Sequence, residues 1–196
     1  MAFLAFTQTR RLRMRSWRKF DPAAAGPQVK PTANLRILGL DPGSRRTGFG
    51  FIDCRGSQYS HVANGCINCA DADMAGRLRR IFEGVQALIA AHQPDEIAVE
   101  RVFVNRNIDS ALKLGQARGA ALSAIPPGAP VFEYAPRAVK AAVVGFGAAD
   151  KQQVAHMMAV LLNIGQTITS DASDALAIAL CHAQNRRIRL LSELAR

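Results

Sequence analysis

Four acidic residues stand at positions from which they could share metal ions. Asp41 and Glu100 each end a short apolar run, in LRILGLD and EIAVE, immediately before a loop. Asp171 and Asp174 are three residues apart at the start of a helical pattern, so their side chains lie on one side of that helix. Carboxylates gathered closely repel one another unless hard cations such as Mg²⁺ lie between them. Two such ions about 4 Å apart can catalyse in-line hydrolysis of a phosphodiester.

Each of these acidic residues also has an ordinary structural explanation. Asp171 could cap its helix, and Asp174 could interact with the positive end of the helix dipole. An acid that ends a strand often only begins a loop. The spacing supports two pairs, Asp41 with Glu100 across strands and Asp171 with Asp174 on a helix, and it leaves open whether the pairs meet.

Periodicity predicts the elements that would position the four residues. Short apolar or alternating runs predict strands at 35–40, 47–53, 57–68, 96–100 and 131–134. Helical spacing predicts helices at 74–92, 109–125, 136–145 and 150–163, and a last helix from about residue 171. Asp109 is placed to cap the second helix, and His156 is expected in the core. The order indicates an α/β fold with a mixed five-stranded sheet, a meander followed by strands reached through helical crossovers.

The strand order bears directly on the first pair of carboxylates. If the strands that end at Asp41 and Glu100 are parallel neighbours, which a crossover helix permits, both side chains project from the same edge of the sheet. Sites in α/β proteins usually lie at that edge.

Composition and charge narrow the classes of partner. The chain of 196 residues suits one globular domain, and its net charge of +10 suits a polyanion such as DNA, because Lys and Arg neutralise phosphates. No stretch approaches the roughly 20 apolar residues of a membrane span, so we expect a soluble protein without a membrane partner. Cys66 and Cys69 form a lone C-x-x-C pair without the further ligands of a zinc site, so we expect neither zinc nor redox use.

The first 34 residues differ from the rest of the chain. They hold seven basic residues against one acidic residue, whereas residues 35–196 hold 18 basic and 14 acidic residues. Clustered arginines, a Pro/Ala/Gly-rich exit and the lack of an apolar period predict a disordered basic extension. A targeting segment or an over-extended gene start would look the same. Residues 35–196 form the predicted nuclease domain.

Four segments of the chain together resemble one protein family. LGLDPGSRRTGFG, VERVFVNRNIDSALKLGQARG, VFEYAPRAVKAAVVGFGAADKQQV and DASDALAIAL occur in this order. In order and spacing they closely resemble the RuvC family of Holliday junction resolvases, over roughly residues 35–185. The extension before this region and the short Arg-rich segment after it are not part of the family pattern.

The resemblance implies a fold, an activity and partners. It implies an RNase H-like fold with helices on both faces of the sheet, and a homodimer that places paired symmetric nicks in a four-way DNA junction during recombination and repair. It implies two Mg²⁺ ions per site, which Mn²⁺ can replace. The partners it implies are junction DNA and a branch-migration motor of the RuvA and RuvB type, in the bacterial cytoplasm.

The resemblance also assigns residues. The family's catalytic and metal-binding acids fall on the four residues named above, Asp41, Glu100, Asp171 and Asp174. Its DNA-contacting lysines fall on Lys140 and Lys151, and its base-stacking aromatic falls on Phe103. Stacking on an unpaired base is worth about 1–3 kcal/mol and tolerates any sequence. Lys113 and Arg118 are further candidates for DNA contact.

Three other interpretations compete with this one. A YqgF-type nuclease would share the DPGSRRTG loop, but that family is shorter and lacks the phenylalanine loop and the VVGFG segment. An actin-like ATPase would need two domains and a much longer chain. A non-catalytic junction-binding protein would be indicated by the loss of one of the four acids, and all four are present.

Overall fold

The fold is seen in a computed structural model that describes residues 34–101, 107–145, 147, 150–165 and 167–194, without the side chains of residues 151, 193 and 194. Nearly all of the expected N-terminal extension lies outside the described residues. The strands are β1 (Asn34–Asp41), β2 (Arg46–Arg55), β3 (Gln58–Asn68), β4 (Glu96–Glu100) and β5 (Val131–Tyr134). The helices are α1 (Met74–His92), α2 (Ile108–Ser123), α3 (Pro136–Val144), α4 (Lys151–Leu161) and α5 (Ser170–Leu194).

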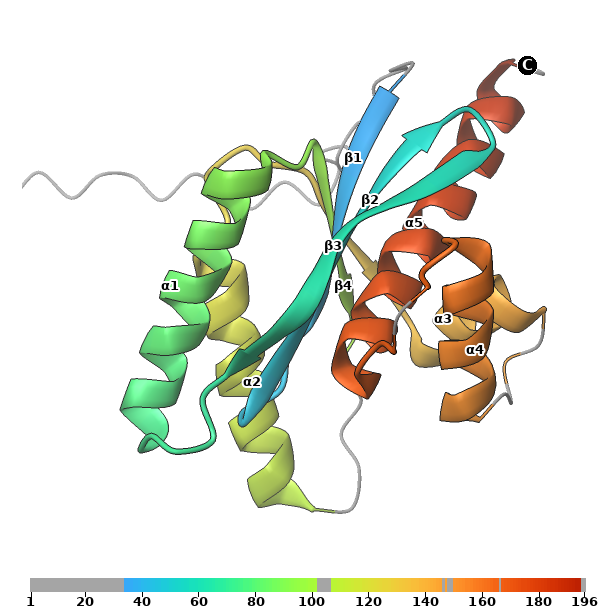
Figure 1. Cartoon of the computed structure of the whole chain (residues 1–196). Coiled ribbons are helices and arrows are strands. Elements are labelled where there is room, and N and C mark those ends of the chain that lie inside the picture. Colours follow the sequence, from blue (N-terminus) through green and yellow to red (C-terminus); the bar gives the residue numbers. More distant parts are fainter. Residues whose placement is uncertain (1–33, 102–106, 146, 148–149, 166, 195–196) are drawn as a thin grey trace, which may run out of the picture.

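The five strands form one mixed sheet in the order β3-β2-β1-β4-β5. β1, β2 and β3 are an antiparallel meander, while β4 runs parallel to β1 and β5 runs parallel to β4. The helices cover both faces, with α1 and α2 on one side and α3, α4 and α5 on the other (Figure 1). The mixed five-stranded sheet predicted from the sequence is therefore confirmed.

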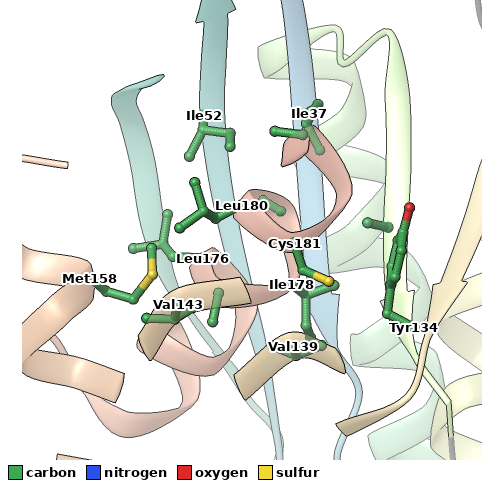
Figure 2. Close-up of a cluster of buried hydrophobic side chains, with 14 of the residues drawn as sticks. Ile37, Ile52, Tyr134, Val139, Val143, Met158, Leu176, Ile178, Leu180 and Cys181 are labelled. Carbon is green, nitrogen blue, oxygen red and sulfur yellow. The ribbon is translucent and has the colours of Figure 1, made fainter. Parts of the chain in front are cut away.

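The alternation of side chains along β1 divides the core into two clusters. Leu35 and Ile37 belong to the cluster beneath α3, α4 and α5, and Leu38 and Leu40 belong to the cluster beneath α1 and α2. The first cluster brings side chains of α5 and α3 onto the strands (Figure 2). Because apolar residues occupy both faces of the central strands, β1 and β4 read as continuous apolar runs.

Two local predictions were wrong. The N-cap of α2 is Asn107, whose side chain accepts a hydrogen bond from the Ser110 amide, whereas Asp109 lies within the first turn. His156 is exposed, because Val154 and Met158 take the buried face of α4 and His156 lies between them in sequence, on the other face. None of the described helices is both long enough and apolar enough to cross a lipid bilayer.

Candidate metal centre

Asp41 and Glu100 end neighbouring parallel strands at the same level. Leu40 of β1 is paired with Val99 of β4, so each acid is the next residue along its strand. Both acids face α5, because side chains alternate along a strand. Ile37, four residues before Asp41, and Ala98, two residues before Glu100, both belong to the core cluster beneath α5. Residues separated by an even number of positions along a strand share a face, so the two acids lie on that face as well. The sheet register therefore aims two carboxylates at the start of one helix.

The loop after Asp41 is folded tightly. The hydroxyl of Thr47, which is fully buried, donates to the carbonyl of Gly43 at 3.2 Å and accepts from the Gly43 amide at 3.4 Å. A Cβ atom at Gly43 would lie 2.4 Å from the backbone oxygen of Arg46, so this turn admits no side chain there. The turn brings the chain directly back into β2, which pairs with β1 up to Asp41.

Glycines in β1 and β2 let α5 lie directly on the sheet. A Cβ atom at Gly39 would lie 2.0 Å from the backbone oxygen of Ala175, and one at Gly48 would lie 2.0 Å from that of Asp171. Such approaches are open only to glycine. Since Gly48 is paired with Asp41 across the two strands, the first turn of α5 is held beside the end of β1.

Three of the four predicted acids share one cavity. Its volume is about 310 Å³, and Asp41, Glu100 and Asp174 line it together with Lys140. Its remaining lining is apolar and comes from α3, α4 and α5: Pro136, Val139, Val154 and Ala177. The three acids and Lys140 are each partly exposed, so water and a substrate can reach them.

Asp171 does not line this cavity. Its carboxylate lies 3.9 Å from the guanidinium of Arg46 and accepts from the thiol of Cys66 at 3.8 Å. Both contacts are long, and about a third of the Asp171 side chain is exposed, which makes the ion pair weak. The sequence interpretation treated Asp171 and Asp174 alike because they are one helical turn apart, but neighbours on a helix can meet different surroundings.

The donor set of the cavity suits a hard divalent cation. No group of three His, Cys, Asp or Glu side chains within the described ranges is close enough to hold a metal ion by itself. Mg²⁺ does not need a closed protein cage, because it commonly binds through one or two carboxylates, with water and substrate phosphate completing its octahedron. Three carboxylates around an accessible cavity fit this pattern of binding.

None of the other predicted DNA-contacting side chains that the structure describes lines the cavity. Lys113 is on α2 and pairs with Asp109 at 2.6 Å, away from the cavity lining. Arg118 pairs with Glu133 of β5 and donates to the backbone carbonyl of Glu100 at 3.4 Å, so it braces the ends of β4 and β5. Phe103 lies outside the described residues, and so does the side chain of Lys151.

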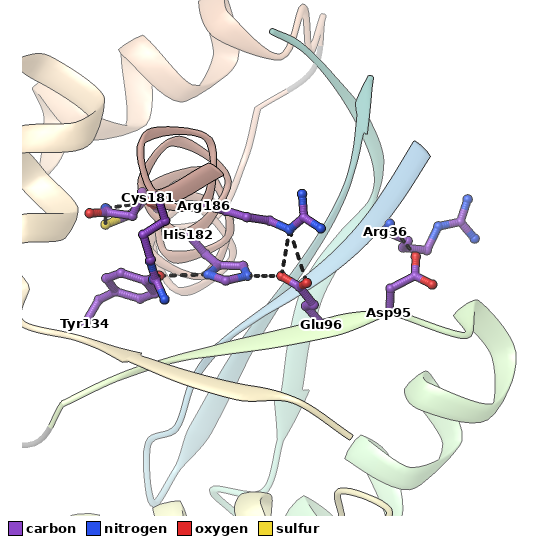
Figure 3. A network of polar contacts seen from close by, with 9 residues as sticks. Arg36, Asp95, Glu96, Tyr134, Cys181, His182 and Arg186 are labelled. Carbon is purple, nitrogen blue, oxygen red and sulfur yellow. Dashed lines mark hydrogen bonds and ion pairs between the residues drawn. The ribbon is translucent and has the colours of Figure 1, made fainter. Parts of the chain in front are cut away.

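A buried polar network, missed in the sequence, links α5 to the other end of β4 (Figure 3). The ring of His182, fully buried, is 2.6 Å from the Glu96 carboxylate through Nε2 and 2.7 Å from the Tyr134 hydroxyl through Nδ1. Arg186 donates to both Glu96 oxygens at 3.1 and 3.2 Å, and Arg189 donates to the Tyr134 hydroxyl at 3.0 Å. The available signal was spacing: His182 and Arg186 are four residues apart on one helix face.

The charges within this network follow from its contacts. Burial favours a raised pKa for Glu96, but hydrogen bonds and charges from His182 and Arg186 outweigh it and lower that pKa. Burial lowers the pKa of His182, against the opposing effect of Glu96. An ionised Glu96 can only accept, so Nε2 of a neutral His182 carries the hydrogen and Nδ1 accepts from Tyr134. Burial raises the pKa of Tyr134 to about 12, which keeps its hydroxyl protonated.

Comparison with known proteins decides the family. The family model of the crossover junction endodeoxyribonuclease RuvC matches residues 37–182. The chain belongs to the RuvC family. The RuvC of Methylococcus capsulatus is 53% identical over 153 residues, which are 78% of this chain and 92% of that relative. The RuvC of a Shewanella strain is 49% identical over 152 residues, 77% of this chain and 88% of that relative.

A solved RuvC structure shares the fold. T. thermophilus RuvC in complex with Holliday junction substrate matches with a TM-score of 0.74 at 33% identity, over 79% of this chain and 96% of that chain. The resemblance read from the four sequence segments is confirmed, and with it the assignment to a family of endodeoxyribonucleases.

Proposed function

We propose that this chain resolves four-way DNA junctions as a Mg²⁺-dependent endonuclease. The observation that carries the proposal is the cavity in which Asp41, Glu100 and Asp174 meet beside Lys140. The names of its RuvC relatives and the Holliday junction in the T. thermophilus complex support junction DNA as the substrate. The bacterial cytoplasm is the proposed location, and a motor of the RuvA and RuvB type is the proposed partner, as family membership implies.

The side chains around the cavity have distinct proposed roles. Asp41, Glu100 and Asp174 would hold Mg²⁺, with two ions per site and with Mn²⁺ as a substitute. Bound there, the metal supplies an activated water and stabilises the leaving oxygen. Lys140 would offset the negative charge that develops on the scissile phosphate. Asp171 is the fourth proposed ligand, and it would have to exchange its contacts with Arg46 and Cys66 for that role.

The remaining proposed contacts are with DNA beyond the cavity. Phe103 would stack on bases opened at the crossover, and Lys151 would contact the DNA backbone. Both assignments rest on family membership. For Lys113 and Arg118 the structure offers protein partners, so we propose no more than a peripheral electrostatic contribution to DNA binding from these two residues.

Paired nicks in a symmetric junction call for two sites, and α2 offers a surface on which two chains could meet. Ile108 and Leu112 are 72% and 64% exposed and lie one helical turn apart, so they form an apolar patch on α2. Gly115 and Gly119 continue the same face at helical spacing, and a Cβ atom at either would meet nothing within 4 Å. We propose that this α2 face packs against its copy in a homodimer, where the glycines let the helix backbones approach.

One experiment tests the function. A synthetic four-way junction and a linear duplex of the same sequence are each incubated with the protein, with Mg²⁺ or with EDTA. We expect two symmetric nicks in the junction with Mg²⁺, none with EDTA, and an intact linear duplex under both conditions. Cleavage in Mn²⁺ should resemble that in Mg²⁺. Equal cutting of junction and duplex, or cutting in EDTA, would contradict the proposal.

A further inference from the structure

Helix α5 is attached to strand β4 at two separate levels. At the end of β4, Asp174 lines the same cavity as Glu100. At the beginning of β4, His182 meets Glu96 at 2.6 Å, and both side chains are buried. The helix and the strand therefore run in opposite directions, with one acidic residue of β4 facing the helix at each end.

The two attachments have matching spacing. Asp174 and His182 are eight residues apart, which is about 12 Å along a helix that rises about 1.5 Å per residue. Glu96 and Glu100 are four residues apart, which is about 13 Å along a strand at about 3.3 Å per residue. An even number of steps also keeps both glutamates on the same face of β4. The contact between Glu96 and His182 can therefore fix where Asp174 lies along β4 relative to Glu100.

We propose that Glu96 and His182 are positioning residues for the metal centre. Their contact sets the position of α5 along β4, and this position sets the separation of Asp174 from Glu100. The inference rests on the proposed metal-dependent function, because it concerns the spacing of the same carboxylates. Neither positioning residue lines the cavity.

A directional contact adds to the packing that holds α5 on the sheet, because a hydrogen bond restrains the position of the helix along β4 in a way that apolar burial alone does not. Apolar burial itself has no direction, and the residues with which α5 covers the sheet are apolar: the small Ala175 and Ala179 and the larger Leu176, Ile178 and Leu180. A buried hydrogen bond, by contrast, is lost when its partners separate by a fraction of a helical turn, and the buried group left behind is costly. The Glu96–His182 contact thus adds its own penalty on sliding to the restraint that the packing supplies.

The surroundings of His182 hold its ring in one orientation. The ring stacks on Phe132 with centroids 4.3 Å apart and accepts from the Tyr134 hydroxyl through its second nitrogen. Arg186, one turn further along α5, holds the Glu96 carboxylate from the same helix. Each hydrogen-bonding atom of the imidazole has a partner, which makes the ring a fixed reference between β4, β5 and α5.

Two substitutions at one position separate the hydrogen bond from the packing. His182→Leu fills the buried position with an apolar side chain and removes the donor to Glu96. His182→Gln restores a nitrogen donor toward Glu96 and is the conservative rescue. Val85→Ala is the control, since Val85 is fully buried in the core cluster beneath α1 and α2, on the opposite face of the sheet. Mn²⁺ binding to the full-length protein is measured by electron paramagnetic resonance, and the melting temperature is recorded for each variant.

The inference predicts that His182→Leu raises the Kd for Mn²⁺ about tenfold, as expected when a residue that positions ligands is lost. His182→Gln should return most of that affinity, and Val85→Ala should lower the melting temperature without changing the Kd. If His182→Leu lowers only the melting temperature and leaves the Kd unchanged, the network is merely a stabilising part of the core and the inference fails.

A milder variant decides the question if His182→Leu does not fold. Tyr134→Phe removes one hydroxyl that orients the imidazole, and we expect a smaller rise in the Kd for Mn²⁺. An unchanged Kd in Tyr134→Phe would then overturn the inference. Failure of the proposed function is distinguishable, because a wild-type protein that binds Mn²⁺ but leaves the junction uncut refutes junction cleavage and not the positioning role.

Discussion

Asp41 and Glu100 extend from two parallel strands at one level, immediately after the paired residues Leu40 and Val99. Their relative position is consequently set by backbone hydrogen bonds of the sheet rather than by loops. A rigid sheet edge suits a metal centre, because ligands must be held to within a fraction of an ångström. The third carboxylate of the cavity, Asp174, is instead carried by α5, so its position depends on how that helix packs on the sheet.

The contact between Gly39 and α5 should contribute strongly to the stability of the fold. In Gly39→Ala the new methyl group would lie 2.0 Å from the backbone oxygen of Ala175, so helix and sheet must separate. We expect the free energy of unfolding in urea to fall by about 3 kcal/mol, the upper range for overpacking. Gly165→Ala is the control, because its methyl group would meet nothing within 4 Å. Equal stability of the two variants would show that α5 does not lie this close.

Lys140 and Lys113 should differ sharply in their effect on cleavage. Lys140 lines the cavity with the carboxylates, whereas Lys113 is paired with Asp109 on α2. We expect Lys140→Ala to lower the single-turnover rate of junction cleavage about 10²-fold, typical for the loss of one group that stabilises charge in the transition state. Lys113→Ala should cleave at nearly the wild-type rate. Comparable losses in the two variants would argue against a specific role for Lys140.

The proposed dimer predicts which exposed leucine matters for association. Leu112→Glu would place two like charges against each other in the α2 interface and should yield a monomer in sedimentation velocity. Leu191→Glu, on the exposed side of α5, removes a leucine of similar exposure, 56% against 64%, and should remain a dimer. A dimer that survives Leu112→Glu but not Leu191→Glu would place the interface at the end of α5.

Much of the fold follows from local patterns in the sequence. The helical spacing of Ile81 and Val85 and the apolar run before Glu100 predict α1 and β4, because burial of one face leaves a periodic trace. Choices between neighbouring residues are harder to predict. Asp109 and Asn107 are both good N-caps, and only the backbone conformation at Asn107, extended at φ −101° and ψ 104°, selects it.

The site was harder to predict from the sequence than the fold, because it depends on contacts between segments that are distant in the sequence. Family resemblance named Asp171 with Asp174, yet the contacts of Asp171 with Arg46 and Cys66 depend on how the first turn of α5 meets β2 and β3. Glu96 looked like an ordinary strand residue, since nothing near it in the sequence shows that His182 will face it.

The buried imidazole predicts how stability depends on pH. Burial lowers the pKa of His182 from 6.5, so the unfolded chain binds a proton before the folded protein does. The stability that neutral His182 contributes is therefore fully present above pH 6.5 and is lost as the pH falls toward the folded pKa. The charges of Arg186 and Arg189 also lower this pKa, whereas Glu96 raises it. The lowered pKa of Glu96 adds a second loss below pH 4.5.

Removing the imidazole should weaken the first of these two losses. Comparing urea midpoints at about pH 7.5 and about pH 5.5, we expect a larger fall for the wild type than for His182→Gln, whose side chain does not titrate. Tyr134, whose hydroxyl meets the ring at Nδ1, stays protonated throughout this range. Identical pH dependence in both proteins would mean that His182 does not titrate on unfolding in this range.

The central claim is that the carboxylates of the cavity carry the cleavage chemistry, and Asp41→Asn tests it most directly. Single-turnover cleavage of a four-way junction in Mg²⁺ is measured beside junction binding in EDTA, with Asp71→Asn, an exposed aspartate paired with Arg80, as the matched control. We predict that Asp41→Asn binds the junction as the wild type does but cleaves it about 10³-fold more slowly, a loss of about 4 kcal/mol, while Asp71→Asn cleaves normally. Undiminished cleavage by Asp41→Asn would contradict the account.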